Sequence, residues 1–324
     1  MKTAIATAIT LSAAALAGCA SSDTTNGSDA AFPDNLSSLT FEVPFDAGGT
    51  TDTIARLMAP MLEEELDVPV QVVNMSERDG QAGFEALAES DPNGAMVGFT
   101  NLPSAVTSYL GTEAGYDKDS FAPLGAVTSL STVIAVHEDS DIDDFTDLVD
   151  AALAAPGDVT LAAGALDDSI QVHQIEEATG AEFNKIPFEG GSSGEVTALL
   201  GKKVDAIIGA PVAMIPNVES GDFRVIAVFG PERIAALPDS PTAIEQGVDL
   251  EMLSRIGLSL SAGTDEETQS ALVDAMDKIA ASPEFVKKVE ALGYEGGFID
   301  PEKFSAEWTD AEGVAQTVID EEGR

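Results

Sequence analysis

The sequence is poor in basic residues. Its 324 residues contain 15 Lys and Arg against 57 Asp and Glu, which gives a formal net charge of −42. A nucleic-acid-binding protein needs a basic surface that contacts phosphates, and this composition does not provide one. Electrostatic docking to an anionic membrane surface is excluded for the same reason. No apolar run of about 18 or more residues follows residue 20, so no membrane-spanning helix is expected beyond that point.

Residues with catalytic or metal-binding chemistry are also scarce. His137 and His173 are the two histidines, and their spacing is not that of metal ligands. Neither a G-x-G-x-x-G nor a Gly-Lys-Ser/Thr signature accompanies the Gly-Gly loops described below, which argues against nucleotide cofactors. We therefore expect no metal, no cofactor and no enzymatic activity. An exported α/β hydrolase is the less favoured alternative.

The N-terminus predicts export and lipid attachment. A lysine at position 2 precedes an uncharged apolar run over residues 3–17, and Leu16-Ala-Gly-Cys19 follows. This pattern looks like a bacterial lipoprotein signal, with cleavage before Cys19 and acylation of its sulfur and amine; an ordinary signal peptide is the alternative. Since Cys19 is the only cysteine, no disulfide is expected. Residues 1–18 would be the signal, and residues 19–38, rich in Ser, Thr, Asp, Asn and Gly, would be a tether averaging roughly 25 Å.

In the remaining chain, segments with the hydrophobic repeat of a β-strand alternate with segments that have the hydrophobic repeat of an α-helix. Strands are predicted at 39–43, 68–73, 95–100, 133–136, 159–163, 184–188, 204–208 and 224–229, and helices at 54–62, 82–88, 145–154, 169–178, 195–200 and through most of the tail from 266. Strands that alternate with helices indicate parallel sheets covered on both faces. At this length two such lobes are expected, with Trp308 and Met58 in the core.

Two loops in the chain have similar sequences. Val43-Pro-Phe-Asp-Ala-Gly-Gly-Thr-Thr51 and Ile186-Pro-Phe-Glu-Gly-Gly-Ser-Ser193 both end a predicted strand and precede a predicted helix. Paired glycines with positive φ can turn successive N–H groups toward an anion, and the helix N-terminus behind them favours negative charge. Plain strand–turn–helix chemistry is the alternative. One loop from each lobe favours two jaws that face each other across a ligand.

These loops, with several further segments in the same order, carry a resemblance to a known family. Val43 to Asp52 is similar to the VPFxxGGxxD loop of the extracytoplasmic solute receptors of tripartite tricarboxylate transporters, the TctC or Bug family. Asp91-Pro-Asn-Gly94, Pro187 to Gly191, and Leu237-Pro-Asp-Ser-Pro-Thr242 resemble its later motifs.

The resemblance implies a two-lobed, periplasmic-binding-protein-like (Venus flytrap) α/β fold with a hinged cleft that holds a small carboxylate. It implies that residues 39–129 and 255–324 form one lobe and residues 130–254 the other. The ligand-binding residues carried over from the family are Phe45, Asp46, Ala47, Gly48, Gly49, Asp52, Thr100, Asn101, Gly164, Asp168, Ser169, Phe188, Glu189, Gly190, Gly191, Ser192 and Arg255.

The chain departs from the family pattern mainly in its acids. Glu189 stands where many members have lysine, and Asp46, Asp167 and Asp168 add negative charge near the loops. If these side chains face the cleft, mono-carboxylates or amino acids should bind better than tri-anions; the alternative is that they face solvent. Arg255 either anchors a second carboxylate or forms a surface ion pair.

The resulting hypothesis is a receptor on the outer face of the cell membrane. It would be a monomer, anchored through Cys19, that passes a carboxylate or amino-acid-like ligand to the membrane subunits of a transporter. A ligand-sensing surface lipoprotein with a signalling partner is the alternative. The acidity is compatible with a high-salt habitat or with an ordinary acidic exported protein.

Overall fold

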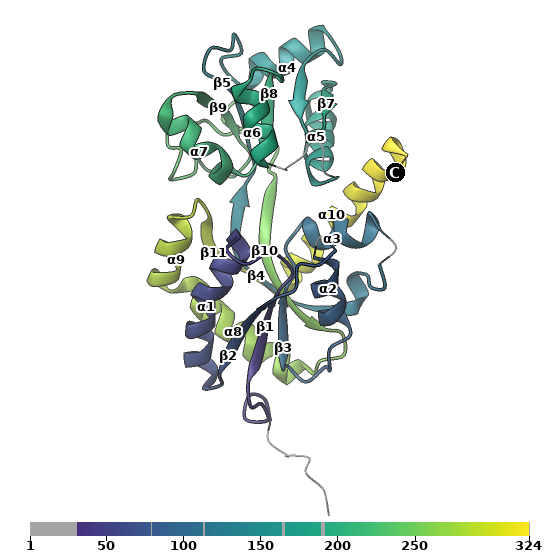
Figure 1. Ribbon diagram of the computed structural model, residues 1–324, viewed down its shortest axis with the longest axis vertical. Helices are drawn as coiled ribbons and strands as arrows, with labels where there is room; N and C mark the ends of the chain where they lie inside the picture. Colours follow the sequence, from purple (N-terminus) through teal and green to yellow (C-terminus); the bar gives the residue numbers. More distant parts are fainter. Residues whose placement is uncertain (1–30, 79, 113, 164–165, 189–191, 324) are drawn as a thin grey trace, which may run out of the picture.

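The computed structural model describes residues 31–323 except 79, 113, 164–165 and 189–191 (Figure 1). The predicted signal peptide and Cys19 lie outside the described residues. No helix among the described residues has the length and apolarity needed to cross a bilayer.

The first lobe is built on a six-stranded sheet with the order β11-β4-β10-β3-β1-β2. Its strands are β1 (Leu39–Val43), β2 (Val70–Asn74), β3 (Met96–Phe99), β4 (Phe121–Ser131), β10 (Leu253–Ser261) and β11 (Glu295–Ile299). Its helices are α1 (Thr50–Leu66), α2 (Gln81–Ala88), α3 (Ser104–Leu110), α8 (Glu266–Ala281), α9 (Pro283–Glu290) and α10 (Pro301–Glu322), with a 3₁₀ turn at Lys118–Ser120.

The second lobe is built on a five-stranded sheet with the order β7-β6-β8-β5-β9. Its strands are β5 (Val133–His137), β6 (Thr160–Ala162), β7 (Asn184–Ile186), β8 (Ala206–Gly209) and β9 (Phe223–Val228). Its helices are α4 (Phe145–Ala154), α5 (Leu166–Thr179), α6 (Ser192–Leu200) and α7 (Pro211–Ser220).

The expectation of wholly parallel sheets is wrong. β1 pairs in parallel with β2 and β3, and β6 pairs in parallel with β7 and β8, as β-α-β units require. However, β10 runs antiparallel to β3 and β4, and β5 runs antiparallel to β8 and β9. The antiparallel strands β4, β5, β9 and β10 are the ones next to the two passages between the sheets, so the strands that join the lobes account for the mixed pairing.

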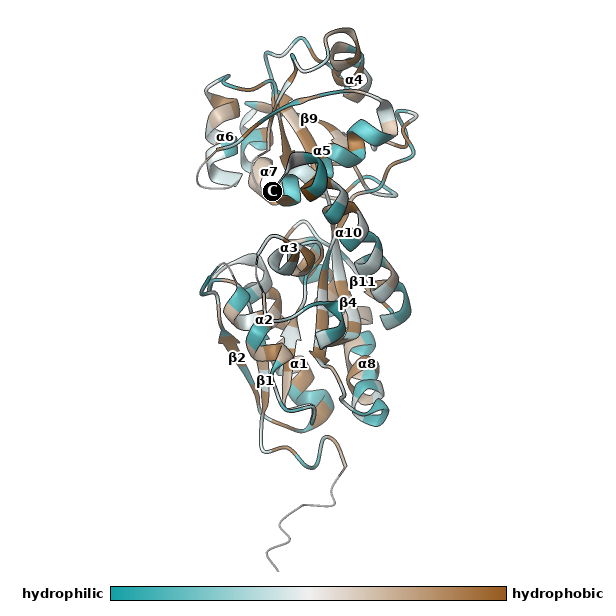
Figure 2. Cartoon of the chain, turned by 90° about the vertical axis from the view of Figure 1, so that its right-hand side faces the viewer, coloured by the Kyte–Doolittle hydropathy of each residue, from teal (hydrophilic) through white to brown (hydrophobic). Residues whose placement is uncertain are grey.

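Each sheet is covered by hydrophobic side chains on both faces. In the first lobe, Phe41 packs with α1 and α8 on one face, while Trp308 of α10 stacks on Phe121 on the other. Trp308 and Met58 are fully buried, which confirms their predicted place in the core. In the second lobe, Phe145 packs edge-on against Phe229. The hydropathy colouring of Figure 2 shows these brown strands inside a more polar surface.

Two chain crossings and one helix connect the lobes. The chain passes from β4 to β5 through Thr132 and returns to β10 after Met252, and these residues are hydrogen-bonded to each other (Thr132 N–H to Met252 C=O, 3.0 Å). Helix α10 rises from the first lobe along the side of α5 (Figures 1 and 2). His173 of α5 pairs with Glu321 of α10 at 3.3 Å. The C-terminal helix is therefore a third connection across the hinge.

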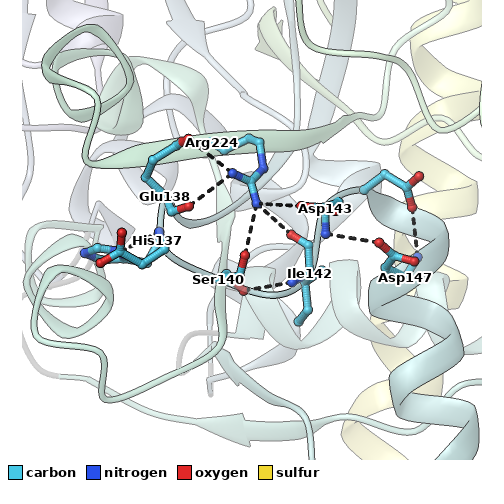
Figure 3. A network of polar contacts seen from close by, with 9 residues as sticks. His137, Glu138, Ser140, Ile142, Asp143, Asp147 and Arg224 are labelled. Atoms are coloured by element: carbon cyan, nitrogen blue, oxygen red, sulfur yellow. Dashed lines mark hydrogen bonds and ion pairs between the residues drawn. The ribbon is translucent and has the colours of Figure 1, made fainter.

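The opposite end of the second sheet is fixed by Arg224 (Figure 3). Its guanidinium donates to the backbone carbonyls of Glu138, Ser140 and Ile142, at 3.2, 3.3 and 3.0 Å, and so holds the turn that follows β5. β5 begins next to the hinge and ends at this turn, so the Arg224 network lies away from the passages between the lobes. Its role is to brace the turn.

Candidate ligand-binding cleft

The loop between β1 and α1 is organised around Asp52. This carboxylate is 3% exposed and accepts hydrogen bonds from the Gly48 N–H (2.8 Å), Arg56 Nε (2.9 Å) and Asn74 Nδ2 (3.0 Å). The hydrogen bond from Arg56 is the main cause that lowers the pKa of Asp52, and burial opposes it. Asp52 therefore ties the loop, α1 and β2 into one unit.

The predicted anion nest in this loop is already partly used by the chain itself. Gly48 has φ 86, as expected, but Gly49 has φ −71. The Gly48 N–H donates to Asp52, and the Gly49 N–H donates to the Asp46 carbonyl at 3.2 Å. Helix α1 begins without a side-chain cap on Gly49, but Asp52 already places a carboxylate in its first turn, at the positive end of the helix dipole. Asp46, Ala47 and both glycines are exposed, and Phe45 is partly buried.

Thr100 and Asn101 follow β3 and lie beneath this loop. Asn101 is 7% exposed and donates from Nδ2 to Thr51 Oγ1 at 2.8 Å, which places it against the first turn of α1. Its Oδ1 is buried and has no hydrogen-bond partner among the described residues. Thr100 is fully buried, and its hydroxyl contacts Ser259 of β10 at 2.6 Å. Thr100 is thus part of the sheet packing, whereas Asn101 adjoins the loop.

On the second lobe, the structure brings together an acid pair from the first turns of α5 and α6. Glu195 is 6% exposed, and its pKa is raised to about 7, first by burial and then by the charge of Asp168 and a hydrogen bond with it. Ser169 is buried, Phe188 packs partly against the second lobe's core, and Ser192 is exposed at the start of α6. The predicted residues Gly164, Glu189, Gly190 and Gly191 lie outside the described residues.

A hollow of about 630 Å³ lies between the two lobes. The first lobe lines it with Phe45, Arg78 and Gln81, with Ser104 and Thr107 of α3, and with Ile319 of α10. The second lobe lines it with Leu166 and Asp167 of α5. Of the described residues predicted for the site, Phe45 is the one that lines this hollow. The sequence reasoning missed Arg78, Gln81, Ser104 and Thr107. Arg78 gave one available signal, because it is among the few cations of a very acidic chain.

Asp167 joins the two walls of the hollow. Its Oδ2 accepts a hydrogen bond from Ser104 Oγ at 3.3 Å, so α5 of the second lobe contacts α3 of the first. Burial raises the pKa of Asp167, and hydrogen bonds from the hydroxyls of Thr107 and Ser104 oppose that rise. Asp167 is one of the acids expected near the cleft, but the sequence pattern does not indicate its contact with α3 of the first lobe.

Arg255 lies in a different hollow, of about 280 Å³, beside the hinge. Its Nε and Nη2 donate to the two carboxylate oxygens of Glu307 at 2.7 and 2.6 Å, and its Nη1 donates to Ser129. Arg255 is 6% exposed and Glu307 is partly exposed, so the ion pair lies at the edge of the hollow with its guanidinium buried. The pair connects β10 to α10.

Residues 190–194 also have the Gly-x-Ser-x-Gly spacing of a nucleophile elbow, centred on Ser192. A serine nucleophile needs an adjacent base. Within the part of the chain that the structure describes, the histidines contact acids elsewhere: His137 is 3.9 Å from Asp139, and His173 is 3.3 Å from Glu321. The spacing therefore gains no support from the geometry.

Two α/β lobes joined by crossing strands, with a hollow between them, define the two-lobed fold of solute-binding proteins. Residues 54–319 match the model of the tripartite tricarboxylate transporter family receptor, TctC, and the chain belongs to this family of solute-binding receptors.

Individual proteins show the same likeness. A protein encoded in the tcbD-tcbE intergenic region of Pseudomonas sp. strain P51 is 29% identical over 287 residues, which cover 86% of this chain and 84% of that protein. A TctC solute-binding protein from Polaromonas aligns with a TM-score of 0.76 at 23% identity, over 87% of this chain and 98% of its own. The Rhodopseudomonas palustris protein Rpa4515, solved with adipate, aligns with a TM-score of 0.69 at 24% identity, over 87% of this chain and 96% of its own. These matches confirm the predicted family and the two-lobed fold.

Proposed function

We propose that this protein captures a small carboxylate-bearing metabolite outside the cytoplasm and delivers it to the membrane subunits of a tripartite tricarboxylate-type transporter. The observation that carries the proposal is the hollow of about 630 Å³ between the lobes of a chain from this receptor family. Its volume lies within the range of about 300–1,000 Å³ of small-molecule sites. The adipate in the R. palustris neighbour supports a carboxylate as the ligand.

The proposed site joins the predicted first loop to this hollow. Phe45 belongs to both, α1 begins directly after the loop, and Asn101 lies against the first turn of that helix. On α5, Asp167 lines the hollow, whereas Ser169 is buried and Asp168 is hydrogen-bonded to Glu195. The N–H groups of Gly48 and Gly49 would reach an anion only if it displaced their present partners, so these glycines shape the loop more than they bind.

Titration of purified protein with mono-, di- and tricarboxylates and amino acids tests the binding proposal. A ligand at about 100 times its Kd stabilises a protein by about 2.7 kcal/mol, roughly 2–4 °C in Tm at this size, which is enough to screen a panel before calorimetry. Saturable binding of at least one carboxylate is the expected result. Absence of binding across the panel, in protein that unfolds cooperatively, would contradict the proposal.

We propose further that the mature chain is held at the outer face of the membrane by lipid on Cys19, with residues 19–38 as a tether. The support is the Leu16-Ala-Gly-Cys19 sequence and the absence of any other cysteine. Cys19→Ala should move the protein from the membrane fraction to the soluble extracytoplasmic fraction and leave ligand affinity unchanged. Full membrane retention of the variant would rule out the lipid anchor while leaving the receptor proposal intact.

A further inference from the structure

The inter-lobe hollow contains two opposite charges. Among its described lining residues, Arg78 is the one basic side chain and Asp167 is the one acidic side chain. Arg78 comes from the loop before α2 of the first lobe, and Asp167 comes from the start of α5 of the second. Each charge therefore belongs to a different wall.

Arg78 is held in place but not fully used. Its Nη1 and Nη2 each donate one hydrogen bond to the carboxylate of Glu85, and the Nη1 bond to Oε1 is 3.1 Å long. Since a guanidinium has five N–H donors, three have no hydrogen-bond partner among the described residues, and the side chain is 55% exposed. Its loop is pinned to the first jaw, because Gly80 has φ 90 and packs so closely on Pro44 that a Cβ would lie 2.4 Å from the Pro44 carbonyl oxygen. The Glu85 pair and this packing preorganise Arg78 for a carboxylate.

Asp167 is the complementary group. The groups that stabilise its charged form are two hydroxyls, Ser104 and Thr107, and neither brings a positive charge. Asp167 is partly buried, and a carboxylate withdrawn from water is costly unless a cation or further donors compensate it. An ammonium group entering the hollow would provide both a positive charge and N–H donors.

The rest of the hollow suits an apolar body. Besides the hydroxyls of α3, its lining includes the aromatic rings of Phe45 and Phe84 and the aliphatic side chains of Leu110, Leu166 and Ile319. Phe45 and Phe84 meet edge to face, with ring centroids 6.5 Å apart. The charged groups would therefore orient a ligand whose remaining carbon atoms pack on these side chains.

We infer that this hollow binds a zwitterionic amino carboxylate with an apolar body, whose carboxylate pairs with Arg78 and whose ammonium pairs with Asp167. This assignment rests on the proposed receptor function and specifies its ligand class. Both lobes would then contact the same ligand, because each lobe supplies one of the two charges. Such a ligand would favour the closed arrangement of the lobes.

Calorimetry with two matched sets of probes tests the assignment. L-leucine is compared with 4-methylpentanoate, which lacks the nitrogen, and with 3-methylbutylamine, which lacks the carboxylate; 5-aminopentanoate is compared with pentanoate. In the wild type, at least one of the two zwitterions should bind about tenfold or more tighter than its matched acid, as expected for a charge-assisted hydrogen-bonded contact. The amine should bind more weakly than L-leucine by a similar factor.

Two variants assign the contacts. Asp167→Asn should remove the preference for the zwitterion without weakening binding of the matched acid, and Arg78→Gln should weaken zwitterion and acid alike. Asp274→Asn and Arg233→Gln are the matched controls, because Asp274 is exposed on α8 and Arg233 pairs with Glu245 outside the hollow. Both controls should bind like the wild type.

The outcomes separate this inference from the function on which it rests. Wild-type protein that binds each acid as tightly as its zwitterion, or binds only di- and tricarboxylates such as adipate and citrate, overturns the inference and leaves the carboxylate receptor standing. Protein that binds none of these probes, although it is folded, overturns both. The wild-type comparison needs no variant, so a fold-defective Asp167→Asn would not prevent a decision.

Discussion

At the scale of single residues, Glu42 is the clearest departure from simple packing rules. It lies in the middle of β1, is fully buried, and has no hydrogen-bond partner for either carboxyl oxygen among the described residues. The carboxyl group fits because Gly83 and Gly98 flank it: a Cβ on them would come within 2.1 and 2.8 Å of its oxygens. Burial raises its pKa to about 8, so Glu42 is protonated at neutral pH.

This position predicts a specific pH dependence of stability. The pKa of Glu42 is about 8 in the folded protein and close to 4.5 in the unfolded chain. The folded state therefore holds a proton that the unfolded state has lost, and the contribution of Glu42 to the free energy of unfolding falls by up to about 1.4 kcal/mol per pH unit across this window. Glu42→Gln should remove this loss, so the variant gains stability relative to the wild type as pH rises from 5 to 8.

Urea unfolding at unit pH steps measures the difference. Glu64→Gln is the control, because Glu64 is exposed on α1 and its substitution should leave the pH profile of the wild type unchanged. Parallel profiles for wild type and Glu42→Gln would show that Glu42 does not hold its proton in the folded state.

At the scale of secondary structure, the sequence predicts some elements well and misses others for a physical reason. Helix α4 begins and ends where predicted, since its apolar residues repeat with the helical period and Asp144 caps it by accepting the Asp147 N–H. Strands β4 and β10 were not predicted. Both are buried along most of their length on both faces, so neither alternates, and both contain Ser and Gly, which are typical of loops. Their pairing also contains two register shifts that no local pattern reveals.

The β1–α1 loop is an element whose stability depends on Asp52. Asp52→Ala removes the acceptor for Gly48, Arg56 and Asn74 together, and should lower the free energy of unfolding by about 2–4 kcal/mol at pH 7. Because the pKa of Asp52 is lowered in the folded state, its contribution is present above its ordinary value of 3.8 and is lost as pH falls below it. The deficit should therefore shrink at pH 3.

Denaturant titrations at pH 7 and pH 3 test this expectation, with Asp277→Ala on the exposed face of α8 as the control. A deficit of equal size at both pH values would mean that the charge of Asp52 is not what holds the loop. Loss of less than about 0.5 kcal/mol at pH 7, the size of an ordinary surface substitution, would mean that the loop does not depend on Asp52 at all.

At the scale of the whole molecule, the sequence predicted the family and the two-lobed fold but not how the lobes meet. The first loop could be located because its Gly-Gly and Asp52 are local features. Arg78, Ser104 and Asp167 come together only through the tertiary arrangement, since α3 and α5 belong to different lobes and are separated by more than 50 residues in sequence. The net charge of −42 is the other property of the whole molecule, because it arises from acids distributed along the chain rather than from one site.

This charge predicts that salt stabilises the folded protein. Like charges are closer together in the compact state than in the unfolded chain, so their repulsion favours unfolding. Raising NaCl from 0.1 to 1 M shortens the Debye length from about 10 Å to about 3 Å and screens that repulsion. The urea concentration at the unfolding midpoint should therefore rise with NaCl at pH 7.

The control is the same titration near pH 4.1, the isoelectric point, where the net charge vanishes and the gain from NaCl should be much smaller. An equal gain at both pH values would assign the effect to salt exclusion from the protein surface, and a fall in the midpoint at pH 7 would mean that local ion pairs such as Arg255 with Glu307 outweigh the repulsion.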